Sequence, residues 1–257
     1  MRNALFEKLK ELRLPGILAN LELRLQEART NQLDFNDFFE LLIDDELNAR
    51  QNRKMQRALK KADFRNLKTL EDFDWQFNPN IERKTFLELA SCQFIRDAHD
   101  LLLIGPPGTG KTHLAQAVGY AAIKAGYSVV YRSIFDVVRD LQQSEISFKP
   151  DSSLNKYLKC DLLIIDDMGL KQLPNKAGEY LFEIIMRRYE LRSTVMTSNR
   201  PIEDWGKLIG DVPTAGAILD RLLQHAQMIP FKGRSYRLTR KSESFAQVAF
   251  DKNEKSE

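Results

Sequence analysis

Residues 101–112 read LLLIGPPGTGKT, and this stretch decides the fold of the chain. Its apolar run predicts a buried strand, and the loop after it fits the pattern GxxxxGK[ST] and leads into the helical sequence LAQAVGYAAIKA. Glycines let the backbone wrap closely around a polyphosphate, so that successive N–H groups and the positive end of the helix point at it. The stretch therefore predicts a phosphate-binding loop for ATP, whose nucleotide-binding residues are Gly105, Pro106, Pro107, Gly108, Thr109, Gly110, Lys111, Thr112 and His113.

Two side chains of this loop have expected roles in phosphate chemistry, and two carboxylates downstream complete the set. Lys111 would reach the β- and γ-phosphates, and the Thr112 hydroxyl would bind Mg²⁺. The apolar run LLII at 162–165 ends in Asp166 and Asp167, at the edge of the sheet where such folds bind ligands. Asp166 is expected to hold Mg²⁺, partly through water, and Asp167 to act as general base or to orient the attacking water. A strand-end turn is the plainer interpretation of this pair, and the preceding phosphate loop argues against it.

Short apolar runs at 101, 128, 162, 194 and 228 alternate with helices of ten or more residues. This alternation predicts an α/β core, with a parallel sheet between layers of helices. The run at 194 continues as TVMTSN, and a strand here beside the Asp166 strand would place Asn199 near the γ-phosphate. An Asn before Arg-Pro also suits a turn, so the residue alone leaves both possibilities open.

A small all-helical domain is expected over residues 1–66, for DNA binding, self-association or both. Leucines recur there at intervals of three and four, Pro15-Gly16 interrupts a helix pair, and Asp34 can cap a third helix that runs towards Ala62. Residues 67–83 are predicted to form a linker, 84–241 the ATPase domain, beginning with a helix at 84–98, and 242–257 a flexible tail.

Composition limits the functional classes. The 257 residues are 43% hydrophobic and 29% charged, as in globular proteins, and no run is long enough to cross a membrane. The amino-terminal sequence lacks the unbroken apolar stretch of a signal peptide, which favours the cytoplasm. Two cysteines and three scattered histidines form neither a disulfide framework nor a zinc site.

A basic run begins in the carboxyl-terminal half of the third expected helix. Residues 50–65 contain seven lysines and arginines and only one acidic residue, Asp63. Such a run is often just a solvated helix face. Binding to DNA phosphates would instead make affinity fall steeply with salt, and the lack of interleaved aromatic residues favours backbone contacts with little sequence reading. The candidate DNA-binding residues are Arg50, Arg53, Lys54, Arg57, Lys60 and Lys61, with Arg65 closing the run. A second basic run comprises Lys232, Arg234, Arg237, Arg240 and Lys241.

Taken in order, the phosphate loop, the Asp166-Asp167 strand, the TSN strand end and the Asp220-Arg221-Leu222 helix resemble AAA+ ATPases of the initiator and helicase-loader group. Residues 1–66, the LEDFDW stretch of the linker and the Arg234-Ser235-Tyr236-Arg237 segment resemble the IstB-like ATP-binding proteins of insertion sequences. The resemblance extends from Leu5 to about Thr239. It implies an ATP-controlled homo-oligomer with shared ATP sites, which binds duplex DNA and engages a transposase. It also implies that Asn199 is the first sensor, Arg221 an arginine finger supplied in trans and Arg237 the second sensor.

The sequence departs from the AAA+ pattern at two places. Most AAA+ proteins carry Glu where this chain has Asp167, which is one methylene shorter and leads us to expect slow turnover. Only about twenty residues follow Arg237, too few for the usual helical lid, so the lid is expected to be reduced or absent.

Two other functions remain open from the sequence. A loader of the replicative helicase would share the core, and the lack of cysteines before Cys92 disfavours only its zinc-containing branch. A binding module with an inert phosphate loop would bind nucleotide and release no phosphate, which the intact Lys111, Thr112, Asp166 and Asp167 argue against.

Overall fold

The computed structural model describes residues 2–147, 150–174 and 176–239. The chain divides into two compact units, Met1–Ala58 and Leu59–Glu257. The expected tail at 242–257 lies outside the described residues, and no described helix has the length and hydropathy that a membrane-spanning segment requires.

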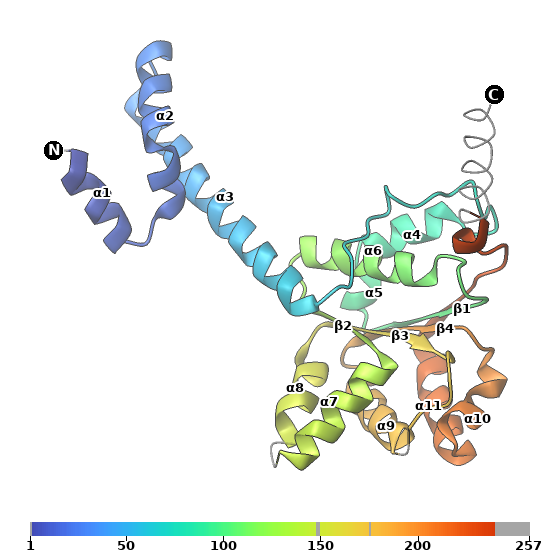
Figure 1. The fold of residues 1–257 in the computed structure, drawn as a ribbon. Coiled ribbons are helices and arrows are strands. Elements are labelled where there is room, and N and C mark those ends of the chain that lie inside the picture. The colour runs from blue at the N-terminus through green and yellow to red at the C-terminus, as the bar shows by residue number, and fades with distance from the viewer. Residues whose placement is uncertain (1, 148–149, 175, 240–257) are drawn as a thin grey trace, which may run out of the picture. The chain divides into compact units, whose positions relative to one another are not determined.

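The first unit is built from three helices (Figure 1): α1 (Arg2–Glu11), α2 (Pro15–Asn31) and most of α3 (Phe35–Ala62), whose last turn belongs to the second unit. Pro15 begins α2 and the Asp34 carboxylate accepts the Asp37 N–H at 2.9 Å, so the predicted helix break and cap are confirmed. Gly16 is required where α2 crosses α3, because a Cβ there would lie 2.5 Å from the Asp45 carbonyl oxygen. Its N–H instead donates to the buried Glu46 carboxylate at 2.6 Å.

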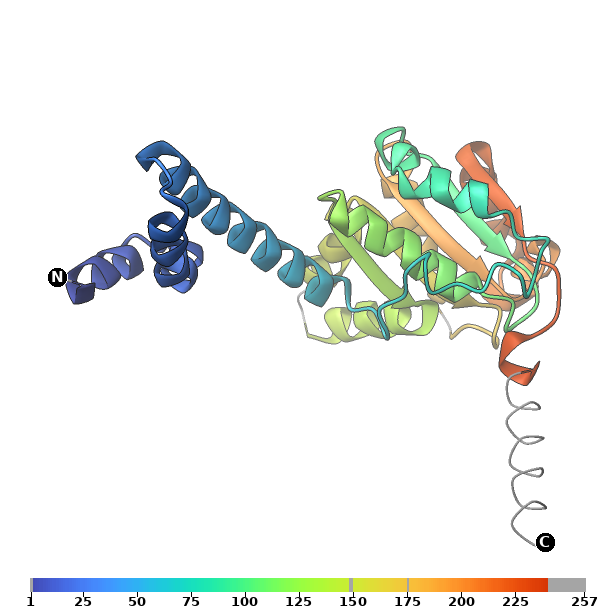
Figure 2. The same ribbon diagram turned by 90° about the horizontal axis from the view of Figure 1, so that it is seen from above.

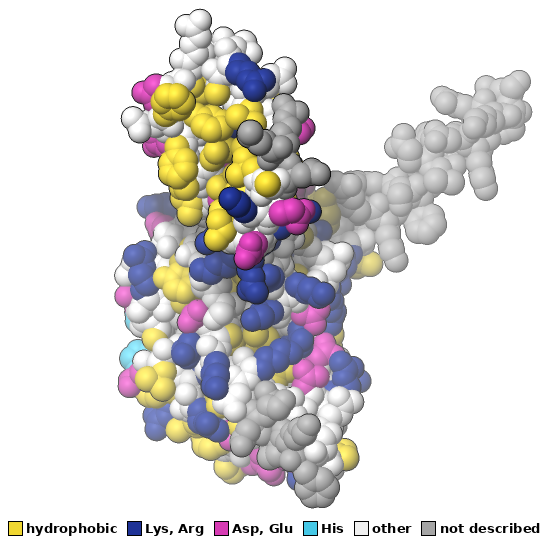
Figure 3. Space-filling model, turned by 90° about the vertical axis from the view of Figure 1, so that its left-hand side faces the viewer, with side chains coloured by type: hydrophobic (Ala, Val, Ile, Leu, Met, Phe, Trp, Pro, Cys, Tyr) yellow, Lys and Arg dark blue, Asp and Glu magenta, His cyan; other side chains and the backbone are white. Residues whose placement is uncertain are grey.

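The core of this helical unit is small. Leu9, Ile17, Leu21 and Leu42 are its buried hydrophobic residues. Many larger apolar side chains stay exposed, and the yellow surface at the top of Figure 3 shows a broad apolar patch on these helices. The most exposed are Leu12, Leu23, Phe35, Phe39 and Leu47, each more than half accessible.

The second unit contains a five-stranded parallel sheet in the order β2-β3-β4-β1-β5. Its strands are β1 (Asp100–Ile104), β2 (Val129–Ser133), β3 (Leu162–Met168), β4 (Ser193–Ser198) and β5 (Ala226–Pro230). All five expected strands are present, and β4 lies beside β3. The α/β prediction is therefore confirmed.

Helices cover both faces of the sheet (Figure 1). One face carries α4 (Arg83–Ala90), α5 (Gln93–Arg96) and α6 (Lys111–Lys124), and Figure 2 looks onto this side. The single helix expected at 84–98 is thus two helices, because Cys92 adopts a left-handed φ of 62° between them. The other face carries α7 (Ile134–Ile146), α8 (Pro150–Lys159), α9 (Ala177–Arg188), the 3₁₀ turn η1 (Ile202–Asp204), α10 (Trp205–Ile209) and α11 (Val212–His225).

The main core lies between the sheet and this second layer. Buried and exposed residues do not alternate along β3, which buries nearly every residue because helices pack on both of its faces. After β5, the described residues 231–239 hold only one short helical turn, at 236–239. The carboxyl ends of β1, β3 and β4 meet at one edge of the sheet, and Lys111, Thr112, Asp166, Asp167 and Asn199 lie at or soon after these strand ends.

Candidate functional site

The phosphate-binding loop joins β1 to α6, as the sequence predicts. Gly105, Gly108 and Gly110 have φ values of 154°, 81° and 107°. The last two values are strained for residues with a Cβ, so the loop needs glycine to turn its N–H groups towards a ligand. Lys111 is the first residue of α6, which places the loop at the positive end of a helix of 14 residues.

Lys111 is folded back onto its own loop. Its ammonium donates to the carbonyl oxygens of Gly105 at 2.6 Å and Pro106 at 2.7 Å, and the residue is only 5% exposed. Burial lowers the pKa of Lys111 to about 8; the charge of Asp166 opposes this shift and that of Arg237 adds to it. A polyphosphate would replace these carbonyl acceptors with charged oxygens, which are the stronger partners for an ammonium.

Asp166 is the centre of a buried hydroxyl network. Its Oδ1 accepts hydrogen bonds from the Thr112 hydroxyl at 3.0 Å and from the Thr197 hydroxyl. Its Oδ2 accepts the Tyr131 hydroxyl at 2.6 Å, and the residue is fully buried. Three strands and the phosphate loop therefore hold one carboxylate in a fixed orientation beside Thr112.

Asp167 follows Asp166 in the chain and is more exposed to solvent than Asp166. Its backbone has a left-handed φ of 66°, and its N–H donates to the Thr197 hydroxyl at 3.2 Å. The side chain is 20% exposed and forms an ion pair with Arg65 at 3.4 Å. Burial and the neighbouring Asp166 raise the pKa of Asp167, whereas the charges of Arg65, Arg237 and Lys111 lower it.

Asn199, Arg237 and His113 are the other residues that the sequence predicts at the nucleotide site, and each has different surroundings. Asn199 directly follows β4, and its N–H donates to the Met168 carbonyl oxygen at 2.8 Å. Arg237 is exposed and close enough to Lys111 and Asp167 for its charge to lower both pKa values. His113 faces the linker instead of the loop, since its Nε2 lies 2.9 Å from the Thr69 carbonyl oxygen.

Two segments distant in sequence cover the phosphate loop. From the linker, the Phe73 ring packs so closely that a Cβ on Gly110 would lie 2.5 Å from it. After β5, the Tyr236 N–H donates to the Gly108 carbonyl oxygen at 3.0 Å. The buried Asn78 amide joins both segments to the loop, with contacts to the carbonyl oxygens of Thr109 at 3.5 Å and Arg234 at 3.3 Å. The linker and the residues after β5 thus form part of the loop's surroundings.

Arg221 is not brought to this site. It lies in the last turns of α11, which leads into the start of β5, and therefore at the opposite, amino-terminal edge of the sheet. Its guanidinium lies over the Tyr189 ring, 5.4 Å from the centroid, and pairs with Asp220 at 3.1 Å. A guanidinium stacked on a ring keeps its in-plane N–H groups available, so Arg221 can contact an anion outside its own chain.

The basic run follows the far half of α3. Arg50 and Arg53 pair with the buried Glu46, at 2.7 and 3.4 Å, and remain about half exposed. The other four candidate residues, Lys54, Arg57, Lys60 and Lys61, are all exposed. Figure 3 shows lysine and arginine side chains in dark blue over much of the face it presents.

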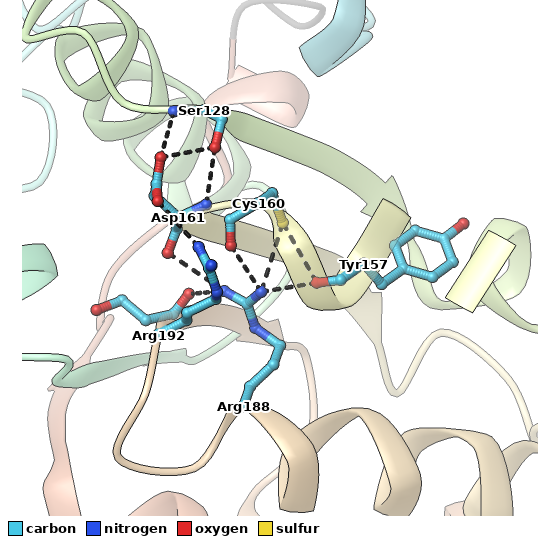
Figure 4. Close-up of polar contacts among 7 residues, drawn as sticks. Ser128, Tyr157, Cys160, Asp161, Arg188 and Arg192 are labelled. Carbon is cyan, nitrogen blue, oxygen red and sulfur yellow. Dashed lines mark hydrogen bonds and ion pairs between the residues drawn. The ribbon is translucent and has the colours of Figure 1, made fainter. Parts of the chain in front are cut away.

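A buried arginine joins the amino-terminal ends of β3 and β4 (Figure 4). Arg188 is 1% exposed, and its guanidinium donates to the carbonyl oxygens of Tyr157, Cys160 and Ser193 at 2.6, 2.8 and 2.5 Å. A further contact reaches the Asp161 carbonyl oxygen at 3.3 Å, and the Asp161 carboxylate accepts from Ser128 and Arg192. Arg188 therefore joins the starts of β3 and β4, whose far ends carry Asp166 and Asn199.

The donor set at Asp166 fits Mg²⁺. Carboxylate and hydroxyl oxygens are hard ligands, and Mg²⁺ is usually held by one or two carboxylates together with substrate phosphates and water. Within the described residues, no group of three or more His, Cys, Asp or Glu side chains could hold a metal ion alone. Thr112 and Asp166 thus fit an ion that arrives with a nucleotide.

The sequence did not indicate that Tyr131 and Thr197 belong to the site. It identified Arg65 as part of the basic run but not as the ion-pair partner of Asp167. Thr197 carries a weak signal, because it is a polar residue inside an apolar strand and lies on the same strand face as Asn199. Tyr131 carries none, since an aromatic residue at the end of an apolar strand is ordinary core material.

Comparison with known proteins agrees with this geometry. The profile of the IstB-like ATP binding proteins matches residues 7–244. An IS21 protein of Pseudomonas aeruginosa, named for ATP binding, is 36% identical over 233 residues, which cover 91% of this chain and 88% of that protein. An IS5376 protein of Geobacillus stearothermophilus, named in the same way, is 34% identical over 94% of this chain and 96% of its own length.

Solved structures show the same fold. The DnaC helicase loader aligns with a TM-score of 0.54 and 21% identity, over 64% of this chain and 96% of the loader. AMPPCP-bound DnaA from Aquifex aeolicus aligns with a TM-score of 0.57 and 24% identity, over 72% of this chain and 57% of DnaA. The nucleotide-binding unit therefore has an AAA+ core, and the chain belongs to the family of IstB-like ATP-binding proteins of insertion sequences.

Proposed function

We propose that this chain is a Mg²⁺-dependent ATPase that assembles on duplex DNA in the cytoplasm and helps the transposase of its insertion sequence to use target DNA. The observation that carries the proposal is the buried Asp166 network beside the phosphate loop. An inert loop would not need a carboxylate held by three hydroxyl groups next to Thr112. Membership of the family supplies the link to transposition.

In hydrolysis, residues at the carboxyl-terminal edge of the sheet would have different roles. Lys111 and the loop N–H groups bind the β- and γ-phosphates, and Thr112 and Asp166 hold Mg²⁺, which neutralises charge on the phosphates when it is bound. Asp167 orients the attacking water and accepts its proton. Asn199 helps to position that water, and Arg237 lies near the γ-phosphate as a second sensor. Because Asp167 is shorter than Glu, we expect slow turnover.

A complete site would use two chains. The Tyr189-stacked Arg221 lies at the edge of the sheet opposite its own phosphate loop, so it would serve the loop of a neighbouring copy as an arginine finger. This arrangement makes hydrolysis depend on assembly.

Duplex DNA would be held by the basic run of α3. Exposed cations on a helix bind phosphates with little sequence reading, and such binding weakens steeply with salt. Duplex DNA could thereby bring copies together and complete their shared sites.

The test is ATP hydrolysis by the purified protein with and without duplex DNA, at two salt concentrations. We expect duplex DNA to stimulate turnover, salt to weaken that stimulation, and Lys111→Ala and Arg221→Ala each to abolish it. A mixture of these two variants should recover activity, because Lys111→Ala copies still provide Arg221 to the intact loops of Arg221→Ala copies.

Other results would favour other functions. Stimulation only by single-stranded DNA or by a helicase would replace this proposal with a helicase loader. Nucleotide binding without any phosphate release would make the chain a binding module, and failure of the mixture to recover activity would remove the shared site.

A further inference from the structure

The three residues after α3 contact the catalytic edge of the sheet at three successive points. Asp63 pairs with Arg132 of β2 at 2.8 Å, and the Phe64 ring packs on Tyr131 with centroids 5.8 Å apart. Arg65 then pairs with Asp167 at 3.4 Å. We call residues 63–65 the anchor segment.

Each catalytic carboxylate is thus linked to the anchor segment. Tyr131, which packs on Phe64, donates its hydroxyl to Asp166 at 2.6 Å, and Arg65 contacts Asp167 directly. All these groups belong to the same compact unit. A polar cavity of about 360 Å³ adjoins them, and its lining includes Asp63, Arg65, Tyr131, Arg132, Asp136 and Arg139.

The ion pair between Arg65 and Asp167 is well suited to be broken. It is a single contact at 3.4 Å, and the Arg65 side chain is 57% exposed, so water screens the attraction. A guanidinium also binds phosphate in a bidentate manner, which makes a DNA phosphate a strong competitor for it. Lys60 and Lys61, in the last turn of α3, lie only five and four residues before Arg65 and could bring such a phosphate close.

The pair also obstructs the role proposed for Asp167. Its Oδ2 is the oxygen that Arg65 contacts, and an oxygen engaged by a cation is a poorer acceptor for the proton of the attacking water. While the ion pair is formed, the Asp167 carboxylate is less able to accept the proton of the attacking water.

We propose that Arg65 is a positioning residue that restrains Asp167, and that duplex DNA on the basic run of α3 draws Arg65 away and frees the carboxylate for hydrolysis. This inference rests on the proposed function, because it takes Asp167 as the base and α3 as the DNA-binding helix. It adds a physical connection between DNA binding at α3 and the activity of Asp167.

The test compares Arg65→Gln with wild type by measuring kcat and KM for ATP, without DNA and with saturating duplex DNA. We expect kcat without DNA to rise at least threefold and kcat with DNA to stay near the wild-type value, so that the stimulation by DNA shrinks. KM should hardly change, since Arg65 does not contact the phosphate loop. Arg65→Lys keeps a cation that can reach Asp167 and should restore most of the restraint.

Arg139→Gln is the matched control. Arg139 lines the same cavity and is 64% exposed, but it pairs with Asp136 at 2.6 Å and not with Asp167. Its replacement removes the same charge and should leave both rates unchanged.

Two results would overturn the inference alone. They are an Arg65→Gln rate without DNA that is equal to or below that of wild type, and an equal rise in Arg139→Gln. Asp167→Asn separates this failure from that of the proposed function: wild-type turnover by this variant would remove the base and both proposals together. An inactive Asp167→Asn beside an unchanged Arg65→Gln would leave the proposed function standing.

Discussion

Replacement of Arg188 by Met should destabilise the nucleotide-binding unit more than almost any other single side-chain change. The guanidinium is buried at the starts of β3 and β4, where it donates to four backbone carbonyl oxygens and to the Thr194 hydroxyl. Methionine fills much of the same volume but has no donor. The substitution therefore leaves all four carbonyl groups without their charged donor, and the contacts to three of them, those of Tyr157, Cys160 and Ser193, are buried.

The magnitude follows from those carbonyl groups. A buried acceptor that loses its partner costs about 1–3 kcal/mol, so the three buried ones cost about 3 kcal/mol at the lower end. Burial of the guanidinium carries a penalty of its own, as its lowered pKa indicates, and its removal returns part of the loss. Removing one partner from a buried charged set costs about 3–5 kcal/mol in other proteins, and we expect about 4 kcal/mol here. Set against a total stability of about 5–15 kcal/mol, this is a large fraction.

The assay is urea denaturation followed by tryptophan fluorescence, because both tryptophans, Trp75 and Trp205, belong to the nucleotide-binding unit. Arg187→Met is the control: Arg187 neighbours Arg188 but is 53% exposed and pairs only with Glu183 among the described residues, so its loss should change stability by no more than about 0.5 kcal/mol. A loss below about 1 kcal/mol for Arg188→Met would refute the reasoning, since it would mean that the carbonyl groups find other donors.

Two further predictions concern Asp100 and Tyr131. Burial raises the pKa of Asp100 from 3.8 to about 6, so between these values the folded protein binds more protons than the unfolded one and loses stability as pH rises. The loss should total about 3 kcal/mol, and urea denaturation at pH 4 and pH 7 should show it reduced in Asp100→Asn; an equal loss in that variant would contradict the assignment. Tyr131→Phe removes the 2.6 Å hydrogen bond to Asp166, and at about 1–3 kcal/mol we expect roughly a tenfold or greater loss of kcat together with a higher Mg²⁺ requirement. A Mg²⁺ titration of ATPase activity measures both, and a wild-type titration curve would show that Tyr131 only fills space.

Much of the fold could be predicted because its signals are local. The strand at 101–104, the glycines after it and the cap at Asp34 are each recognised within a few residues, and each is present in the structure. The position of Asp166 followed in the same way, because the carboxyl ends of neighbouring parallel strands meet at one edge.

The partners of those residues could not be predicted, because they depend on strand order. Thr197 reaches Asp166 only because β4 inserts between β3 and β1, and Tyr131 reaches it only because β2 pairs with β3. Arg188 offers an even weaker signal. An arginine near the end of an amphipathic helix is expected in solvent, and only the completed fold shows that four carbonyl groups turn inward to meet it.

The placement of Arg221 limits how copies could share their sites. Under the proposed function, the phosphate loop follows the end of β1 while Arg221 lies towards the edge where β1 begins, and a strand of five residues spans about 16 Å. A head-to-tail contact would bring the Arg221 edge of one copy to the loop edge of the next, and it would extend to further copies until it closes into a ring or runs on as a filament. A filament or ring that follows DNA would complete one ATP site with each added copy, and turnover per chain would then rise with the length of DNA covered.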